Sequence, residues 1–171
     1  MSKINIVLYE PEIAENVGST MRTCFLTNSK LHIIEPTGFI FDHRFLARSS
    51  ANTHKHCEYE LYDDWQSFCQ KNENGKFFYL TRYGNKPISD FDLKEVKEDI
   101  FFIFGRESTG IPKDILIDNI DNCFRIPMVT EGRSLNISNC VAIVVYEGLR
   151  QYDYLDLCKF ETQKGKDYLK K

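Results

Sequence analysis

The run from Gly105 to Gly110, Gly-Arg-Glu-Ser-Thr-Gly, is the first candidate for chemistry in this 171-residue chain. Its glycine spacing is that of a phosphate-binding P-loop, but Ile111 and Pro112 follow where that loop carries Lys and Ser or Thr. Without that lysine no side chain neutralises the terminal phosphates of a nucleoside triphosphate. The pattern therefore argues against nucleotide hydrolysis and leaves a glycine-bounded loop with one carboxylate, Glu107.

Metal and hydrolase chemistry find little support in the sequence. His54, His56 and Cys57 are close together, but their spacing is unusual for zinc and no fourth ligand is evident. The chain has neither a G-x-S-x-G elbow nor an H-E-x-x-H motif. We expect no metal.

The elements that must position the candidate residues alternate between strand and helix patterns. Mainly apolar runs predict strands at 4–9, 31–34, 77–81, 100–104 and 123–126. Helices are expected at 16–27, from about 63, after Pro112, and at 136–152, while 84–87 reads as a turn. This order predicts an α/β fold with a mostly parallel sheet flanked by helices. Ligands of such sheets bind at the carboxyl ends of the strands, so the segments 10–18, 105–112 and 127–136 predict one composite site.

Composition and length bound the class of protein. With 27% charged and 42% hydrophobic residues, the chain is neither disordered nor low-complexity. We expect a single domain over residues 1–158 and a Lys-rich tail over 159–171. No run is long enough to span a membrane and no signal peptide is recognisable, so we expect a cytoplasmic protein whose six cysteines stay reduced.

Charge is unevenly distributed along the chain. The net charge is −3, yet residues 22–56 carry five Lys or Arg and all four histidines. This asymmetry could give an acidic protein one face that attracts phosphate groups. From charge counting alone, a mixed solvated surface is the better interpretation.

Three sequence blocks resemble one enzyme class when taken together. They are Asn-Val-Gly-Ser-Thr-Met-Arg at 16–22, Phe-Gly-Arg-Glu-Ser-Thr-Gly-Ile-Pro at 104–112, and the stretch from Ile-Pro-Met at 126–128 to Arg-Ser-Leu-Asn-Ile-Ser-Asn at 133–139. In order and context they resemble the three motifs of SPOUT-class, S-adenosylmethionine-dependent RNA methyltransferases that modify ribose 2′-hydroxyls. The flanks at 5–13, 31–36 and 144–147 are similar to the small tRNA (cytidine/uridine-34) 2′-O-methyltransferases, which act on the wobble nucleotide.

The resemblance implies a fold and a cofactor. Members of the class carry a deep trefoil knot at the C-terminal end of the sheet, here formed by 105–112 and 127–139. S-adenosylmethionine would lie bent in that knot, with its adenine held largely by main-chain groups. The residues that match this role are Leu80, Gly105, Ile126, Met128, Ser134 and Leu135. The glycines let backbone pass close to backbone, and Gly105 and Gly110 can adopt positive φ where needed.

The resemblance also implies catalytic roles. Arg22 matches the arginine placed at the target ribose; because a guanidinium is a poor base, we expect it to orient phosphate and 2′-oxygen while the proton passes to phosphate or water. Asn16 would hold the first motif, and Glu107 would accept hydrogen bonds from Asn16 or steady the second. Ser134 and Asn136 would shape the pocket near the sulfonium.

Partners follow from the same resemblance. A chain of this size resembles members that act as homodimers, in which Arg22 of one subunit works beside the cofactor of the other. The substrate would be the anticodon stem-loop of tRNA, gripped by the basic stretch 22–56 with Arg82, Lys86 and Arg133.

Plainer interpretations remain open. Asn16 and Asn136 could simply cap their helices, and Arg22 could be a surface ion-pair partner. The chain could act on ribosomal RNA or another tRNA position, could be an inactive RNA-binding homologue, or could be an α/β enzyme for a small metabolite.

Overall fold

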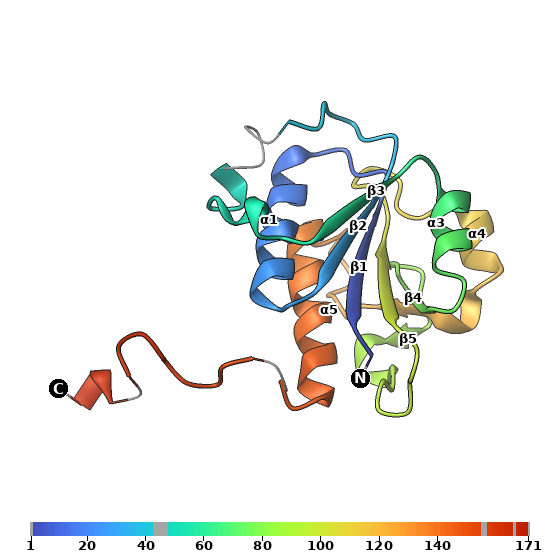
Figure 1. Ribbon diagram of the computed structural model, residues 1–171. Coiled ribbons are helices and arrows are strands. Elements are labelled where there is room, and N and C mark those ends of the chain that lie inside the picture. Colours follow the sequence, from blue (N-terminus) through green and yellow to red (C-terminus); the bar gives the residue numbers. More distant parts are fainter. Residues whose placement is uncertain (1, 43–47, 155–156, 166, 171) are drawn as a thin grey trace.

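The protein is described by a computed structural model that covers residues 2–42, 48–154, 157–165 and 167–170. At its centre is a seven-stranded sheet with the strand order β3-β2-β1-β6-β4-β7-β5, in which every pairing is parallel (Figure 1). The strands are β1 (Ile4–Tyr9), β2 (Lys30–Ile34), β3 (Tyr59–Tyr62), β4 (Lys76–Leu80), β5 (Lys86–Pro87), β6 (Ile100–Phe104) and β7 (Cys123–Arg125). All seven carboxyl ends therefore meet at one edge of the sheet.

Helices cover both faces of this sheet. The helices α1 (Ala14–Leu26) and α5 (Ile137–Gln151) lie on one face, while α3 (Trp65–Lys71) and α4 (Lys113–Ile117) lie on the other (Figure 1). Short 3-10 helices are also present at Thr53–Lys55, Ile88–Asp90, Ile120–Asn122 and Tyr168–Lys170. The result is a three-layer α/β/α arrangement.

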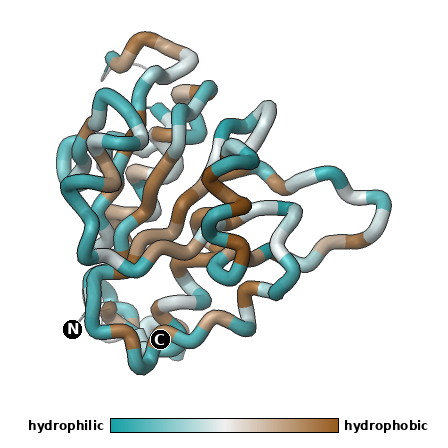
Figure 2. Tube along the Cα trace, turned by 90° about the vertical axis from the view of Figure 1, so that its right-hand side faces the viewer, coloured by the Kyte–Doolittle hydropathy of each residue, from teal (hydrophilic) through white to brown (hydrophobic). Residues whose placement is uncertain are grey.

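Two apolar cores hold the layers together, one on each face of the sheet. Alternate residues of β1 belong to different cores: Ile6 and Leu8 pack with α1 and α5, whereas Val7 packs with Phe68 of α3. This division follows from the two-residue period of a strand. Figure 2 shows the hydrophobic strands in the centre of the molecule and hydrophilic connections around them.

The predicted α/β class and parallel sheet are confirmed, as is the burial of β6 on both faces. Two edge strands differ from the sequence prediction. β3 was not predicted, and the expected turn at 84–87 is wrong in its second half, because Lys86 and Pro87 pair with β7 as β5. α1 begins at Ala14, two residues earlier than expected.

Glycine is needed at positions 105 and 110 for two different reasons. Gly110 has a φ of +75°, in the left-handed region that favours glycine. Gly105 does not have positive φ. Glycine is required there by the close approach of two backbone segments, since a Cβ would lie 2.1 Å from the carbonyl carbon of Gly110. The trefoil knot itself stays a prediction.

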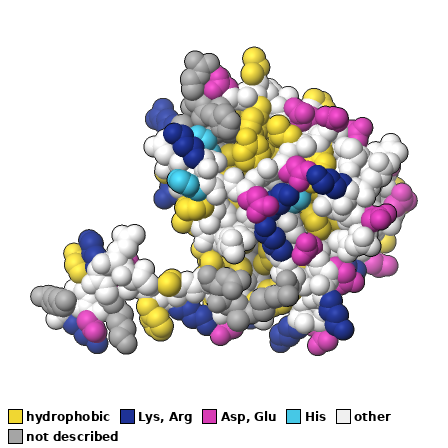
Figure 3. All heavy atoms as spheres, in the orientation of Figure 1, with side chains coloured by type: hydrophobic (Ala, Val, Ile, Leu, Met, Phe, Trp, Pro, Cys, Tyr) yellow, Lys and Arg dark blue, Asp and Glu magenta, His cyan; other side chains and the backbone are white. Residues whose placement is uncertain are grey.

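The C-terminal tail leaves the body of the molecule after α5 and carries basic side chains (Figures 1 and 3). Lys166 and Lys171 of the tail, and residues 43–47 of the basic stretch, lie outside the described residues. Within the described part of the chain, no helix is long and apolar enough to cross a membrane.

Candidate active site

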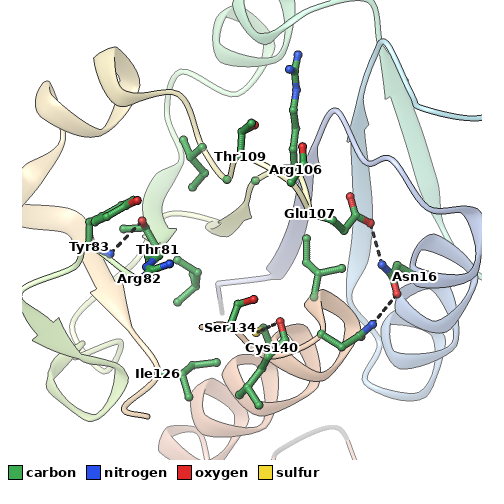
Figure 4. Close-up of a pocket in the computed structure, with 18 of the residues that line it drawn as sticks. Asn16, Thr81, Arg82, Tyr83, Arg106, Glu107, Thr109, Ile126, Ser134 and Cys140 are labelled. Carbon is green, nitrogen blue, oxygen red and sulfur yellow. Dashed lines mark hydrogen bonds between the residues drawn. The ribbon is translucent and has the colours of Figure 1, made fainter. Parts of the chain in front are cut away.

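A pocket of about 440 Å³ opens at the carboxyl ends of β4, β6 and β7. Its walls come from the segment after β4, the loop after β6, the segment between β7 and α5, and the start of α1 (Figure 4). We call it the central pocket. Its walls include every residue that sequence reasoning assigned to the cofactor: Leu80, Gly105, Ile126, Met128, Ser134 and Leu135.

Three of the predicted catalytic residues form a continuous hydrogen-bonded chain beside this pocket. The side-chain amide of Asn136 donates to Oδ1 of Asn16 at 2.9 Å, and Nδ2 of Asn16 donates to Oε1 of Glu107 at 2.8 Å (Figure 4). Each residue comes from a different one of the three motifs. Asn16 is almost fully buried, and burying its amide without hydrogen-bond partners would cost free energy. The two bonds satisfy its side-chain N–H and its carbonyl oxygen.

The loop after β6 is fastened further to the loop between β1 and α1. The second carboxylate oxygen of Glu107 accepts a hydrogen bond from the backbone N–H of Glu12 at 2.8 Å. In return, the carboxylate of Glu12 accepts hydrogen bonds from the backbone N–H and the hydroxyl of Ser108, at 2.8 and 2.7 Å. These bonds from Ser108 lower the pKa of Glu12 below its usual range. Arg106 forms an ion pair with Glu10 beside them.

Both asparagines were considered as helix caps, with different outcomes. Oδ1 of Asn136 accepts hydrogen bonds from the backbone N–H groups of Ser138 and Asn139, so Asn136 does cap α5. The cap position of α1 is Ile13, and Asn16 lies inside the helix, so the capping alternative is wrong for Asn16. Asn136 thus couples the start of α5 to the first motif.

Gly105 brings two stretches of the same loop into direct contact. Besides the approach to Gly110, a Cβ would lie 2.2 Å from the backbone nitrogen of Ile111. Arg106 and Gly110 exchange backbone hydrogen bonds at 3.2 and 2.9 Å, which closes residues 106–110 into a compact turn. This turn forms one wall of the central pocket.

Arg22 stands apart from the other predicted site residues. It is exposed on α1 and is not among the residues that line the central pocket. Within the described part of the chain its side chain forms no ion pair, so the ion-pair alternative finds no partner there. Phe25 and Leu26, further along the same helix, are also exposed apolar residues.

Part of the pocket wall was not predicted as such, although Arg82 was predicted to contact RNA. The segment Thr81, Arg82 and Tyr83 lines the pocket, as do Ile137 and Cys140 of α5. A signal for the first group existed, because these residues directly follow a strand whose carboxyl end faces the site. Burial raises the pKa of Cys140, which therefore behaves as a small apolar wall residue.

His54, His56 and Cys57 were considered above as metal ligands. His54 is buried, and its Nδ1 lies 3.0 Å from the hydroxyl of Ser50. Over the described ranges of the chain, no three His, Cys, Asp or Glu side chains are placed to hold a metal ion.

The central pocket suits a ligand with a flat apolar part and a few hydrogen-bonding groups. Its volume falls within the range of small-molecule and cofactor sites. Leu80, Ile126 and Leu135 supply apolar walls, while the turn at Gly105 brings main-chain groups close. These features fit the adenosine portion of S-adenosylmethionine.

Comparisons with known proteins bear directly on this site. The chain is 44% identical over 154 residues to a Bacillus subtilis protein whose name assigns it tRNA (cytidine(34)-2′-O)-methyltransferase activity, covering 90% of this chain and 96% of that one. It is 39% identical to the Escherichia coli K12 tRNA (cytidine(34)-2′-O)-methyltransferase, with 88% and 95% covered.

Solved structures agree. A Bacillus anthracis protein described as an RNA methyltransferase matches with a TM-score of 0.86 and 43% identity, covering 93% of this chain and 99% of that one. A structure concerned with 2-OH methylation of C/U34 on tRNA matches with a TM-score of 0.81 and 29% identity, covering 89% and 97%. The model of the SpoU rRNA Methylase family matches residues 3–146. The chain therefore belongs to the SpoU methylase family.

Proposed function

We propose that this protein transfers the methyl group of S-adenosylmethionine to the ribose 2′-hydroxyl of nucleotide 34, a cytidine or uridine, in the anticodon loop of tRNA. The observation that carries the proposal is the full-length similarity to relatives named for that reaction, at up to 44% identity. It is supported by the way the fold gathers the three motifs around one pocket.

The residues around the central pocket have separable tasks in this proposal. Leu80, Ile126 and Leu135 would enclose the adenine, with main-chain groups at Gly105 and Met128 providing its hydrogen bonds. Bound S-adenosylmethionine supplies an activated methyl group on a sulfonium sulfur. The protein's contribution is alignment, because holding the acceptor oxygen in line replaces an improbable encounter with a single oriented step.

The hydrogen-bonded chain of Asn16, Glu107 and Asn136 would maintain that alignment. The three residues belong to α1, the loop after β6 and the start of α5, so a shift of one segment would be transmitted to the other two. Ser134 lies on the wall adjoining this chain, where its hydroxyl would contribute a polar group near the sulfonium.

Arg22 would act on the pocket of a second subunit in a homodimer. Its exposure and its absence from the wall of its own pocket support this arrangement. Exposed apolar residues on the two adjacent helices also support it: Phe25 and Leu26 on α1, Ile143 and Tyr146 on α5. Arg22 would donate hydrogen bonds to a phosphate and to the 2′-oxygen, and the proton would pass to phosphate or water.

RNA contacts would extend beyond the reacting ribose. Arg82 and Arg133 are exposed near the pocket mouth and, with the described part of the basic stretch 22–56, would bind phosphates in a salt-dependent manner. With tRNA as the substrate, we expect the protein in the cytoplasm, with residues 1–158 forming the methyltransferase domain and the Lys-rich tail outside it.

Ribosomal RNA is the second candidate substrate. The matching family model is described by rRNA methylation, and that description favours this alternative over others. A catalytically inactive RNA-binding role would leave the cofactor pocket without a purpose.

One experiment separates these cases. Total tRNA and ribosomal RNA from cells lacking the protein are each incubated with the protein and S-adenosylmethionine labelled in its methyl group, and the nucleosides are identified by mass spectrometry. We expect labelled 2′-O-methylcytidine or 2′-O-methyluridine derivatives from tRNA and none from ribosomal RNA. Label only in ribosomal RNA would favour the second candidate, and label in neither would contradict both.

A further inference from the structure

A second cavity, of about 780 Å³, lies against the central pocket on the side of α4. We call it the α4 groove. Its outer wall consists of Leu116, Ile117 and Ile120, and its inner wall is the turn after β6. The role proposed above for the central pocket leaves this larger cavity without an occupant.

The two cavities share part of their walls. Six residues line both: Thr81, Tyr83, Arg106, Thr109, Gly110 and Ile111. A substrate whose reacting group is held at the central pocket would therefore extend naturally into the α4 groove. This continuity favours a part of the same substrate as the occupant over an unrelated ligand.

The groove presents apolar surface that water would otherwise cover. Ile117 and Ile120 have 59% and 60% of their surface exposed, and Tyr83 has 73% exposed. Clustered exposed apolar side chains commonly mark binding sites. Here the cluster lies beside a pocket that faces the solvent.

Tyr83 supplies a platform for stacking. The guanidinium carbon of Arg82 lies 5.6 Å from the centre of the Tyr83 ring, so a cation and an aromatic face are already paired at the edge of the groove. Unpaired nucleobases bind to such faces because every base has a flat π-surface.

The charges at the groove also suit a nucleotide. None of the described residues that line it is acidic, and Arg106 and Lys113 are basic. Arg106 is paired with Glu10, whereas Lys113 forms no ion pair within the described ranges and is exposed to solvent. The acidic residues of α4, Asp114 and Asp118, are not part of the groove wall. Lys113 is therefore available to a phosphate beside a base held in the groove.

We propose that the α4 groove binds one unpaired nucleobase of the RNA substrate, within a nucleotide or two of the methylated ribose. The assignment rests on the proposed function and deepens it, since it names the part of the RNA recognised outside the reacting nucleotide. Bases of an RNA loop can be splayed out and stacked on aromatic side chains, unlike those of a paired helix.

The test measures coupling between the groove and single bases. A set of tRNAs is prepared in which one anticodon-loop nucleotide at a time is abasic, and their dissociation constants for the full chain are measured with saturating S-adenosylhomocysteine. The deciding variant is Ile117→Ser/Ile120→Ser, because these exposed residues line only the α4 groove. Leu61→Ser on β3, at the opposite side of the sheet, is the matched control.

We expect one abasic position to weaken binding to the unaltered protein by about 5- to 150-fold, the loss of one base–aromatic stack. Ile117→Ser/Ile120→Ser should already bind intact tRNA more weakly. In this variant the abasic nucleotide should weaken binding further by only about 2-fold or less, because the variant and the missing base remove the same contact. Tyr83→Ala should behave in the same way, and Tyr83→Phe should retain the coupling.

If the loss of affinity caused by each abasic nucleotide is the same in the groove variants as in the unaltered protein, the assignment is overturned. Intact tRNA binding to Ile117→Ser/Ile120→Ser as tightly as to the control would also overturn it. Methyl transfer by the unaltered protein is measured in parallel: transfer without coupling rejects only the groove assignment, whereas absence of transfer to any RNA rejects the proposed function.

Discussion

Asn16 and Asn136, 120 residues apart in the chain, are joined by a 2.9 Å hydrogen bond between their side-chain amides. Asn136 also caps α5, and Asn16 also donates to Glu107. Two hydrogen bonds that meet at Asn16 therefore link α1, the start of α5 and the loop after β6. The geometry of the pocket depends on this link because none of the three segments is a neighbour of the others in sequence.

Changing Asn16 to Asp should disconnect the site without removing volume. The new carboxylate would replace a donor with an acceptor and face the carboxylate of Glu107, so the two would repel. We expect the rate of methyl transfer to fall by about 10²-fold, the scale associated with a misplacement of roughly 1 Å. Single-turnover rates measure the effect, with the exposed Asn74→Asp as control. Equal rates in the two variants would show that the link is not needed.

Gly105→Ala should damage both stability and cofactor binding. The added methyl group would lie 2.1 Å from backbone, so the turn must move, at a cost of about 1–3 kcal/mol or more. Gly165→Ala is a useful contrast, because that glycine has positive φ but open space around it in the tail. Thermal unfolding measures the stability of the two variants, and calorimetric titration with S-adenosylmethionine measures their cofactor affinity. Unchanged cofactor affinity in Gly105→Ala would argue against the tight turn as part of the pocket.

If Arg22 of one subunit acts at the pocket of the other, two variants that are inactive alone should restore activity when they form a mixed dimer. Arg22→Ala keeps its own pocket, and Ile126→Asp keeps Arg22 but places a charge in the pocket wall. After unfolding and co-refolding in equal amounts, half of the dimers should be mixed, each with one intact composite site, so about a quarter of the original activity should return. Activity that stays at the level of the separate variants would mean that Arg22 serves its own subunit.

His32 should make stability fall in mildly acidic solution. It is buried between β1 and β3, with its ring nitrogens 2.8 Å from the hydroxyl of Tyr62 and 3.2 Å from Oδ1 of Asn5. Burial is the main cause that lowers its pKa from 6.5 to about 4. The folded state therefore resists protonation that the unfolded chain accepts, so stability is full above pH 6.5 and declines as pH falls towards 4.

Between pH 7 and pH 5 this decline should amount to about 2 kcal/mol. Urea unfolding at the two pH values measures it. His32→Gln should remove most of the difference, while the exposed His56→Gln should retain it. Glu60, whose pKa is lowered to about 2 mainly by its hydrogen bond from Lys30, contributes a further decline only at more acidic pH. A pH dependence that persists in His32→Gln would assign it to other groups.

The central strands were predictable because their apolar runs satisfy both faces of the sheet. β3 escaped prediction because it lies at the edge and contains Glu60, which pairs with Lys30 and Lys71 instead of entering the core. β5 is too short for any periodicity and includes Pro87. Edge strands are specified by such tertiary contacts, which local patterning does not report.

The candidate site also contains residues that the sequence predicts and residues that it does not. Glycine and amide residues at fixed spacings pointed to the loops that build the pocket, because backbone approach and paired amides demand those residue types. Thr81 and Tyr83 carry no such signature, and their place on the wall follows only from the end of β4. The position of Arg22 relative to the reacting ribose depends on a second subunit, which one sequence does not display.

Locating the methyl group on tRNA tests the proposed reaction most directly. Alkaline hydrolysis requires attack by the ribose 2′-oxygen on the adjacent phosphate, so a 2′-O-methyl group leaves a gap in the cleavage ladder. Isolated tRNA from cells lacking the protein is compared before and after treatment with the protein and S-adenosylmethionine. We predict a new gap immediately after nucleotide 34, absent when Arg22→Ala is used. A complete ladder at that position, or a gap only elsewhere, would show that the protein does not methylate nucleotide 34.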